Sequence, residues 1–126
     1  MKSVISAVVI FIFIVVTGLV STIYVDNATK EMLQIVYKNE NYFSKSKWKE
    51  AENEILKLEK YWAEKRRVLS VFINHINLME VDITVSKLKN ATKMHENTDF
   101  FYESDNLELI LLNINEQQKI SIENIF

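Results

Sequence analysis

The most distinctive hydrophobic pattern lies at the start of the chain. From Val4 to Val25 the sequence carries no charged residue. A helix rises about 1.5 Å per residue, so a segment of this length spans the ~30 Å hydrocarbon core of a bilayer. We therefore predict that residues 1–25 form a transmembrane anchor in the cytoplasmic membrane, with residues 4–25 in contact with the lipid bilayer.

The same segment also has features of a secretory signal peptide, since Lys2 precedes an apolar run. However, no A-x-A-like cleavage site follows the run, and Tyr24 lies where an interfacial aromatic residue is expected. These features favour an uncleaved, single-pass signal anchor. Because Lys2 is the charged side chain before the span, the positive-inside rule places the N-terminus in the cytoplasm and residues 26–126 outside it.

The next polar and apolar positions predict helices. Residues 26–43 fit a short helix that continues from the anchor, and Ser46 is a candidate N-cap for the following one. Beyond it, apolar residues recur every seven positions, with a second set three residues later. The first set is Trp48, Ile55, Trp62, Leu69, Ile76 and Ile83, and the second is Ala51, Leu58, Phe72 and Met79. This spacing predicts a long amphipathic helix in heptad register.

Polar residues interrupt that helix near its middle. Asn77 followed by Glu80 fits a capping box that would start a new helix. The preserved heptad instead favours a continuous or kinked helix across the segment Asn74–Asn77. Both alternatives stay open at the level of sequence.

The C-terminal part predicts one more helix. After a polar interruption at Lys93–Thr98, Asp99 is a candidate cap, and an apolar stripe follows at Phe100, Leu107, Leu111 and Ile114. The isoleucines of the last ten residues are too closely spaced for that stripe. We expect an extended or turned tail that packs back on the bundle. The overall prediction is an all-α fold: the anchor followed by a small antiparallel bundle of three helices, the long central one continuous, kinked or broken.

Composition narrows the function classes. The chain has no proline, one glycine, no cysteine and a formal net charge of −2. Glycine-rich phosphate loops, serine-nucleophile elbows and thiolate metal sites are therefore not expected, and no overall basic field favours nucleic acid. Basic residues predominate between 45 and 67 and acidic residues from 96 onward. We expect these two segments to face each other and to specify the register of the bundle.

Several residues together resemble a known family. They are Trp48, Trp62, the stretch LSVFINHINLMEVDITVSKLKN around His75, and the terminal ISIENIF. Their order resembles the small membrane-anchored helical proteins of Firmicutes grouped as domain-of-unknown-function family 4363. The resemblance covers most of the chain beyond the anchor. It implies a membrane location, a helical architecture and an accessory role beside a multi-pass membrane protein.

The candidate residues are packing or interface residues: Trp48, Trp62, Phe72, His75, Met79, Ile125 and Phe126. His75 is either a pH-sensitive group between two helices or a partly buried side chain satisfied by a neighbour. Lys65, Arg66 and Arg67 form either a patch for anionic headgroups or a solvated flank. No catalytic, metal-ligating or cofactor-binding set and no small-molecule substrate is indicated.

The sequence therefore predicts a non-enzymatic accessory or interaction protein at the outer face of the membrane. The alternative is an extracytoplasmic ligand-sensing domain that works with a separate signalling partner.

Overall fold

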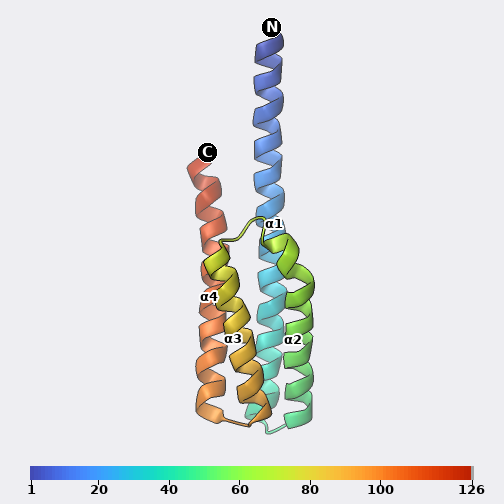
Figure 1. Ribbon diagram of the computed structural model, residues 1–126, viewed down its shortest axis with the longest axis vertical. Helices are drawn as coiled ribbons and strands as arrows, with labels where there is room; N and C mark the ends of the chain where they lie inside the picture. The colour runs from blue at the N-terminus through green and yellow to red at the C-terminus, as the bar shows by residue number, and fades with distance from the viewer. Residues whose placement is uncertain (126) are drawn as a thin grey trace.

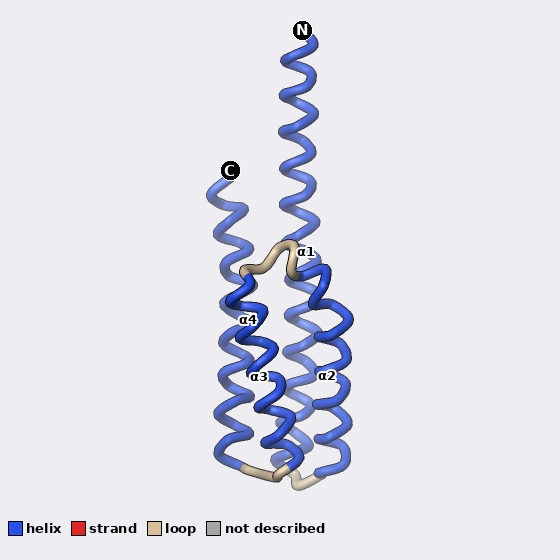
Figure 2. The backbone as a smooth tube through the Cα atoms, in the orientation of Figure 1, coloured by secondary structure: helices blue, strands red, loops and turns tan. Residues whose placement is uncertain are grey.

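The computed structural model describes residues 1–125 and places them in four α-helices without a strand. The helices are α1 (Lys2–Ser44), α2 (Trp48–Leu69), α3 (His75–Lys93) and α4 (Asn97–Ile125). They run alternately up and down, and each packs against its two neighbours in the ring α1–α2–α3–α4 (Figures 1 and 2). The all-α prediction is confirmed, but the expected three helices are four.

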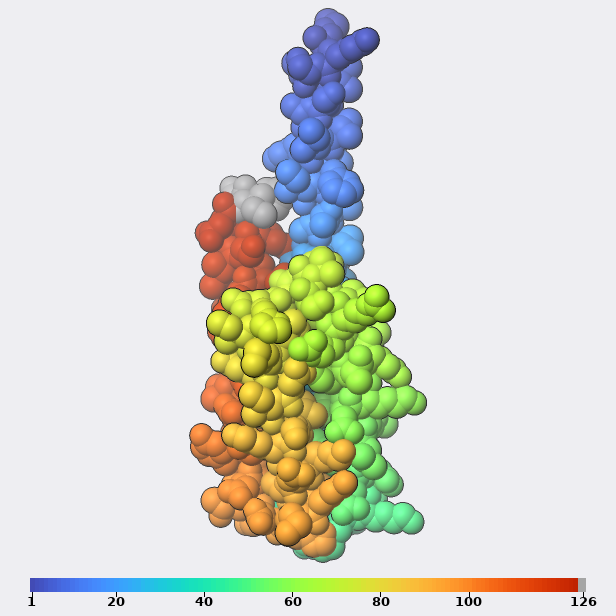
Figure 3. Space-filling view, viewed as in Figure 1, coloured from blue at the N-terminus to red at the C-terminus, as the bar shows by residue number. Residues whose placement is uncertain are grey.

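Helix α1 is much longer than the others. It continues without a break from Lys2 to Ser44, so its N-terminal half stands clear of the bundle (Figure 3). Side chains up to Val20 are largely exposed, and burial begins at Ser21. Within residues 1–125, α1 is the one helix long and apolar enough to cross a membrane, and its most apolar stretch is not buried.

Hydroxyl groups within the apolar stretch are satisfied by the helix itself. Ser6 and Thr17 donate to the carbonyl oxygens of the residues four positions earlier. Ser21 and Thr22 both donate to the carbonyl oxygen of Gly18, at 2.8 and 3.0 Å. These bonds remove the penalty that a free hydroxyl would carry in an apolar environment.

The first two helices meet through heptad seams. The core positions of α1 alternate in steps of four and three: Val25, Thr29, Met32, Val36, Asn39 and Phe43. Those of α2 are Ala51, Ile55, Leu58, Trp62 and Leu69. Such spacing keeps one face of each helix toward the bundle axis along its length. The predicted seam is therefore confirmed as far as Leu69.

The predicted long helix breaks after Leu69. The chain reverses through residues 70–74, and α3 begins at His75 with Asn74 as its N-cap, whose Oδ1 accepts a 2.8 Å hydrogen bond from the backbone N–H of Ile76. The capping box at Asn77 and Glu80 is therefore wrong, because Asn77 already lies inside the helix. The break itself was one of the two open alternatives.

The reversal also changes which face of the third helix is buried. Ile76, Met79 and Ile83 were expected in the core, but they are 64, 45 and 50% exposed. Leu78, Val81, Val85 and Leu88 fill the core instead. A non-helical turn resets the helical phase, so the seven-residue spacing that crosses it carries no information about packing.

Three other predicted boundaries are wrong. Ser46 is not an N-cap: it has a left-handed φ of 57° in the α1–α2 turn, and Lys47 precedes α2. The C-terminal tail is not extended, because α4 continues as a helix to Ile125. Asp99 is not a cap either, because it lies in the first turn of α4, which begins at Asn97. With no proline or glycine nearby, nothing in the sequence ends that helix.

The ion pairs also differ from the expected charge pairing. Arg66 pairs with Asp82 at 2.8 Å and Lys89 with Glu59 at 3.0 Å, and both pairs join α2 to α3. Basic α2 and acidic α4 are not neighbours in the ring. The prediction that these two segments face each other is therefore wrong.

Candidate functional site

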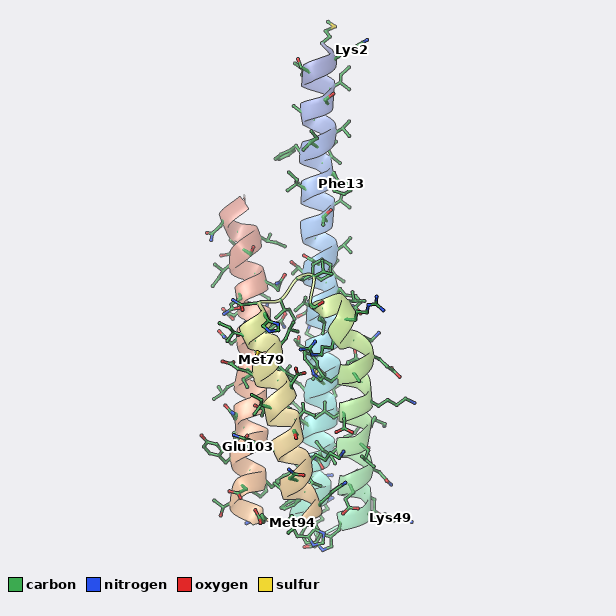
Figure 4. All side chains as sticks on the ribbon, in the orientation of Figure 1. Lys2, Phe13, Lys49, Met79, Met94 and Glu103 are labelled. Atoms are coloured by element: carbon green, nitrogen blue, oxygen red, sulfur yellow. The ribbon has the colours of Figure 1, made fainter. Side chains whose placement is uncertain are left out.

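A groove runs along the outside of the bundle between α3 and α4. Its larger hollow, about 550 Å³, lies at the end far from the apolar half of α1, where Figure 4 labels Met94 and Glu103. It is lined by Lys87, Asn90, Ala91, Lys93, Met94, Glu96, Asp99 and Glu103. A second hollow of about 310 Å³ lies nearer the α2–α3 turn and is lined by Glu80, Ile83, Thr84, Lys87, Asn106 and Ile110. Lys87 belongs to both hollows.

Helical spacing explains why these residues converge. Lys87, Asn90, Ala91 and Met94 follow one another at steps of three, one and three, so they share one face of α3. Glu96, Asp99 and Glu103 have the corresponding spacing at the start of α4. The α3 wall therefore carries ammonium groups and the α4 wall carries carboxylates.

The most unusual group in the groove is the carboxylate of Glu103. The residue is only 9% exposed, and its Oε2 is buried without a hydrogen-bond partner. Among the described residues, Lys87 and Lys93 are not paired with any carboxylate either. Removing a carboxylate from water is unfavourable unless a cation or a donor compensates it. The groove thus offers an unsatisfied acceptor to a positively charged group.

The groove also holds a pair of carboxyl groups, those of Glu96 and Asp99. A hydrogen bond with Asp99, together with the negative charge of Asp99, raises the pKa of Glu96. Both groups are exposed. They add negative charge next to Glu103 without providing a nucleophile or a general base held against a substrate.

The predicted candidate residues do not form one site. Trp48 is half-buried at the far end, where its ring stacks on His95 at 4.1 Å. Phe72 lies at the opposite end of the bundle, 6.5 Å from the ring of Tyr24. His75 and Met79 are exposed, so His75 is neither a group held between two helices nor a partly buried side chain, and both alternatives for it are wrong. Phe126 and the side chain of Ile125 lie outside the described residues.

Trp62 is the predicted residue that belongs to a polar network. Its Nε1–H donates to Oδ1 of Asp82 at 2.6 Å, and Arg66 binds the same carboxylate through Nε and Nη2. Burial raises the pKa of Asp82, but the hydrogen bonds from Arg66 and Trp62 outweigh burial, and the pKa lies below its ordinary value. This network fixes α2 against α3.

Sequence reasoning missed both Asp82 and Glu103. Asp82 meets Arg66 across the α2–α3 turn, so the pair becomes visible only when the turn is placed. Glu103 is three residues after Phe100, which is fully buried, and that spacing was the available sign that Glu103 faces inward.

An acidic cluster lies where α1 and α4 meet, and contacts within the bundle account for it. Carboxylate oxygens of Glu40, Asp105 and Glu108 lie within 4.8 Å of one another. Burial is the main cause of a raised pKa at Glu40, and a hydrogen bond from Ser104 opposes it. Tyr37 donates a 3.0 Å hydrogen bond to Glu108. Because side-chain donors already satisfy two of the three carboxylates, nothing in the cluster calls for a bound cation.

Comparison with known proteins identifies the family. No curated protein and no solved structure matches the chain. Residues 19–125 match the family described as Domain of unknown function (DUF4363), which covers the whole bundle and the end of the apolar stretch. The chain belongs to this family, as the residues around His75 and the terminal segment had indicated.

Proposed function

We propose that this protein is a membrane-tethered helical bundle that acts as an accessory or interaction protein at the outer face of the cytoplasmic membrane. The observation that carries the proposal is the continuity of α1. One unbroken helix has an exposed apolar half up to Val20 and a buried half that forms a wall of the bundle. Water contact with large apolar side chains is unfavourable by ~1.5–3 kcal/mol each, which a bilayer removes.

A labelling experiment tests the tether and its direction. The chain has no cysteine, so a single cysteine at Lys49, at the far end of the bundle, can be compared with one at Lys2 (Figure 4). We expect an impermeant thiol reagent to label Lys49→Cys in intact cells and Lys2→Cys only after lysis. The reverse pattern would overturn the orientation.

Fractionation and mass analysis address the other readings of the same segment. Recovery of the protein in the soluble fraction after an alkaline wash of the membranes would overturn the tether. A mature chain whose mass lacks the first two dozen residues would identify a cleaved signal peptide instead of an anchor.

The partner surface of this proposal is the exposed apolar stripe of α3, made of Ile76, Met79 and Ile83. The expected partner is a multi-pass membrane protein, as the family resemblance implies. A photo-crosslinking residue at Ile83 is expected to give one specific adduct in native membranes. The same residue at Asn53, which is exposed on polar α2, serves as the matched control. Identical adduct patterns at both positions would argue against a partner on this stripe.

The alternative, a ligand-sensing domain, is favoured by the unpartnered carboxylate of Glu103. Ammonium groups on one wall and carboxylates on the other fit a small zwitterion such as a free amino acid. We expect at least one of the free amino acids to raise the Tm of the detergent-solubilised full chain in a saturable way, and Glu103→Gln to abolish that rise. A flat response across all of them would reject this ligand class.

A further inference from the structure

Helix α4 extends beyond the α2–α3 turn, in the direction of the apolar half of α1. Asn115 Nδ2 donates a 2.8 Å hydrogen bond to Oδ1 of Asp26, so these two residues lie at one level of the antiparallel pair. From this level α4 continues to Ile125, and because the two helices are antiparallel, the part of α1 beside it runs from Asp26 toward Lys2. At a rise of about 1.5 Å per residue, the end of α4 lies ~15 Å past Asp26, and ten residues back along α1 from Asp26 is Val16. Figure 1 shows the C-terminal end of α4 beside the exposed half of α1.

This geometry conflicts with a bundle that stays wholly in water. If Lys2 remains at the inner polar boundary, the ~30 Å hydrocarbon core reaches about twenty residues along α1, close to Thr22. The residue of α4 at the level of Thr22 is Lys119, since each is four positions from the Asn115–Asp26 contact. With α1 across the bilayer in this way, the part of α4 after Lys119 lies at or below the outer surface of that bilayer.

The sequence of α4 changes character at that level. Ile120 is 50% exposed and Ile122 is half-buried, and a third isoleucine follows at position 125. Lys119 itself is exposed, and a lysine at a bilayer boundary extends its ammonium group to the phosphates. Glu123 comes four residues after Lys119, so its carboxylate stays within about one helical turn of the polar boundary.

The α2–α3 turn lies at the same height. Its Phe72 packs 6.5 Å from the ring of Tyr24, and its carbonyl oxygen accepts a 2.9 Å hydrogen bond from Gln118. Next to it Val71 is 75% exposed and Val68 is 45% exposed. One exposed apolar side chain in the turn and one in the last turn of α2 thus lie beside the point where α1 leaves the bundle.

Basic side chains accompany this apolar surface. Lys65 places its Nζ 5.8 Å from the centre of the Tyr24 ring, and Arg67 is exposed at the end of α2. With Lys119 they give three cations near one level of the molecule. Cations at this height are attracted to anionic headgroups.

We propose that the bundle rests directly on an anionic lipid surface through a membrane footprint. The footprint consists of the apolar residues Val68, Val71, Ile120 and Ile122 and the basic residues Lys65, Arg67 and Lys119. The proposal rests on the membrane tether. It adds that the α2–α3 turn and the last turns of α4 enter the interface, so that the bundle is docked on the bilayer and not merely suspended from it.

Depth-dependent fluorescence quenching tests the footprint in the full-length protein. Single cysteines at Ser121 near the end of α4, at Tyr102 near its start, and at Phe13 in the apolar half of α1 (Figure 4) would each carry an environment-sensitive fluorophore. The protein would be reconstituted in vesicles of phosphatidylcholine and anionic phosphatidylglycerol that contain a lipid quencher either near the headgroups or near the ends of the acyl chains, in separate samples. We expect a blue-shifted, strongly quenched signal at Ser121, and no quenching at Tyr102, which is 68% exposed.

The three positions separate the two proposals. A label at Phe13 that the acyl-chain quencher does not quench would overturn the tether. A quenched label at Phe13 with an unquenched label at Ser121 would overturn the footprint and leave the tether intact.

A second measurement tests whether the basic residues hold the α2–α3 turn on the anionic lipid, with Val71 as the labelled position. Quenching of a fluorophore on Val71→Cys is expected to weaken in vesicles of phosphatidylcholine alone and in the Lys65→Gln, Arg67→Gln, Lys119→Gln triple variant. Equal quenching in all three conditions would show that the anionic surface is not what the turn recognises.

Discussion

Asn39 gives the sharpest test of how the bundle is held together. It occupies a core position of α1 with 0% exposure, and neither its Oδ1 nor its Nδ2 has a hydrogen-bond partner among the described residues. An unpaired buried amide lowers stability by ~1–3 kcal/mol. Leucine branches at the same carbon as asparagine, so in Asn39→Leu two methyl groups take the places of the amide oxygen and nitrogen with little overpacking. We expect the substitution to increase the free energy of unfolding by about 2 kcal/mol, which corresponds to a Tm rise of about 10 °C.

The measurement is urea and thermal unfolding of the full-length protein in detergent, followed by helical circular dichroism. Asn41→Leu is the matched control: it makes the same chemical change two positions further along α1, where the side chain is exposed, and should alter stability by less than about 0.5 kcal/mol. A destabilised Asn39→Leu protein would refute the reasoning, because it would mean that the amide has a partner in the folded state. The oligomeric state should be measured alongside, since buried asparagines can specify helix register.

Three further predictions follow from the packing and the electrostatics. Phe100→Ala removes a fully buried ring stacked on Phe43 at 3.7 Å and should lower the free energy of unfolding by about 3–5 kcal/mol, whereas Tyr102→Ala, at a 68% exposed position, should change it little in the same urea titration. Ser46→Gly should raise stability by about 1 kcal/mol, because φ at Ser46 is 57° and glycine adopts this conformation without strain; loss of stability would show that the hydroxyl matters more than the backbone. Asp82→Asn should lower stability at pH 7 by about 1 kcal/mol, a small value because more than a third of the carboxylate is exposed. Since the folded pKa of Asp82 is lowered, the wild-type advantage should be complete above the ordinary value of 3.8 and disappear as pH falls through the folded pKa; an advantage that persists in acid would contradict the ion pair.

The sequence was informative where a single helix explains the pattern. The charge-free run of α1 and the seam of α2 through Ile55 and Trp62 could be predicted because both are properties of one continuous helix. The α2–α3 turn could not be placed, because it contains neither glycine nor proline and because Leu69, Ile76 and Ile83 keep a seven-residue interval across it by coincidence. For the same reason Met79 was assigned to the wrong face.

The candidate site was less predictable than the fold. The groove depends on which helices become neighbours, and the charge-based expectation paired α2 with α4 although α3 lies between them. Helical spacing alone can align Lys87 with Met94 on α3, or Glu96 with Glu103 on α4. It does not reveal that these two faces meet, nor that Glu103 lacks a partner.

Because α1 is one unbroken helix, a tilt of its N-terminal part is transmitted to the whole bundle. With the proposed anchor in a bilayer, α1 has no turn between the lipid and the far end of the bundle, and Gly18, its only glycine, lies within the exposed stretch. The helix from Ser21 to Ser44 is about 35 Å long, so a change of about 10° in its tilt would swing the far end sideways by about 6 Å. A variation in bilayer thickness that tilts the span would thereby move the Glu103 groove laterally, without any change in the packing of the bundle itself.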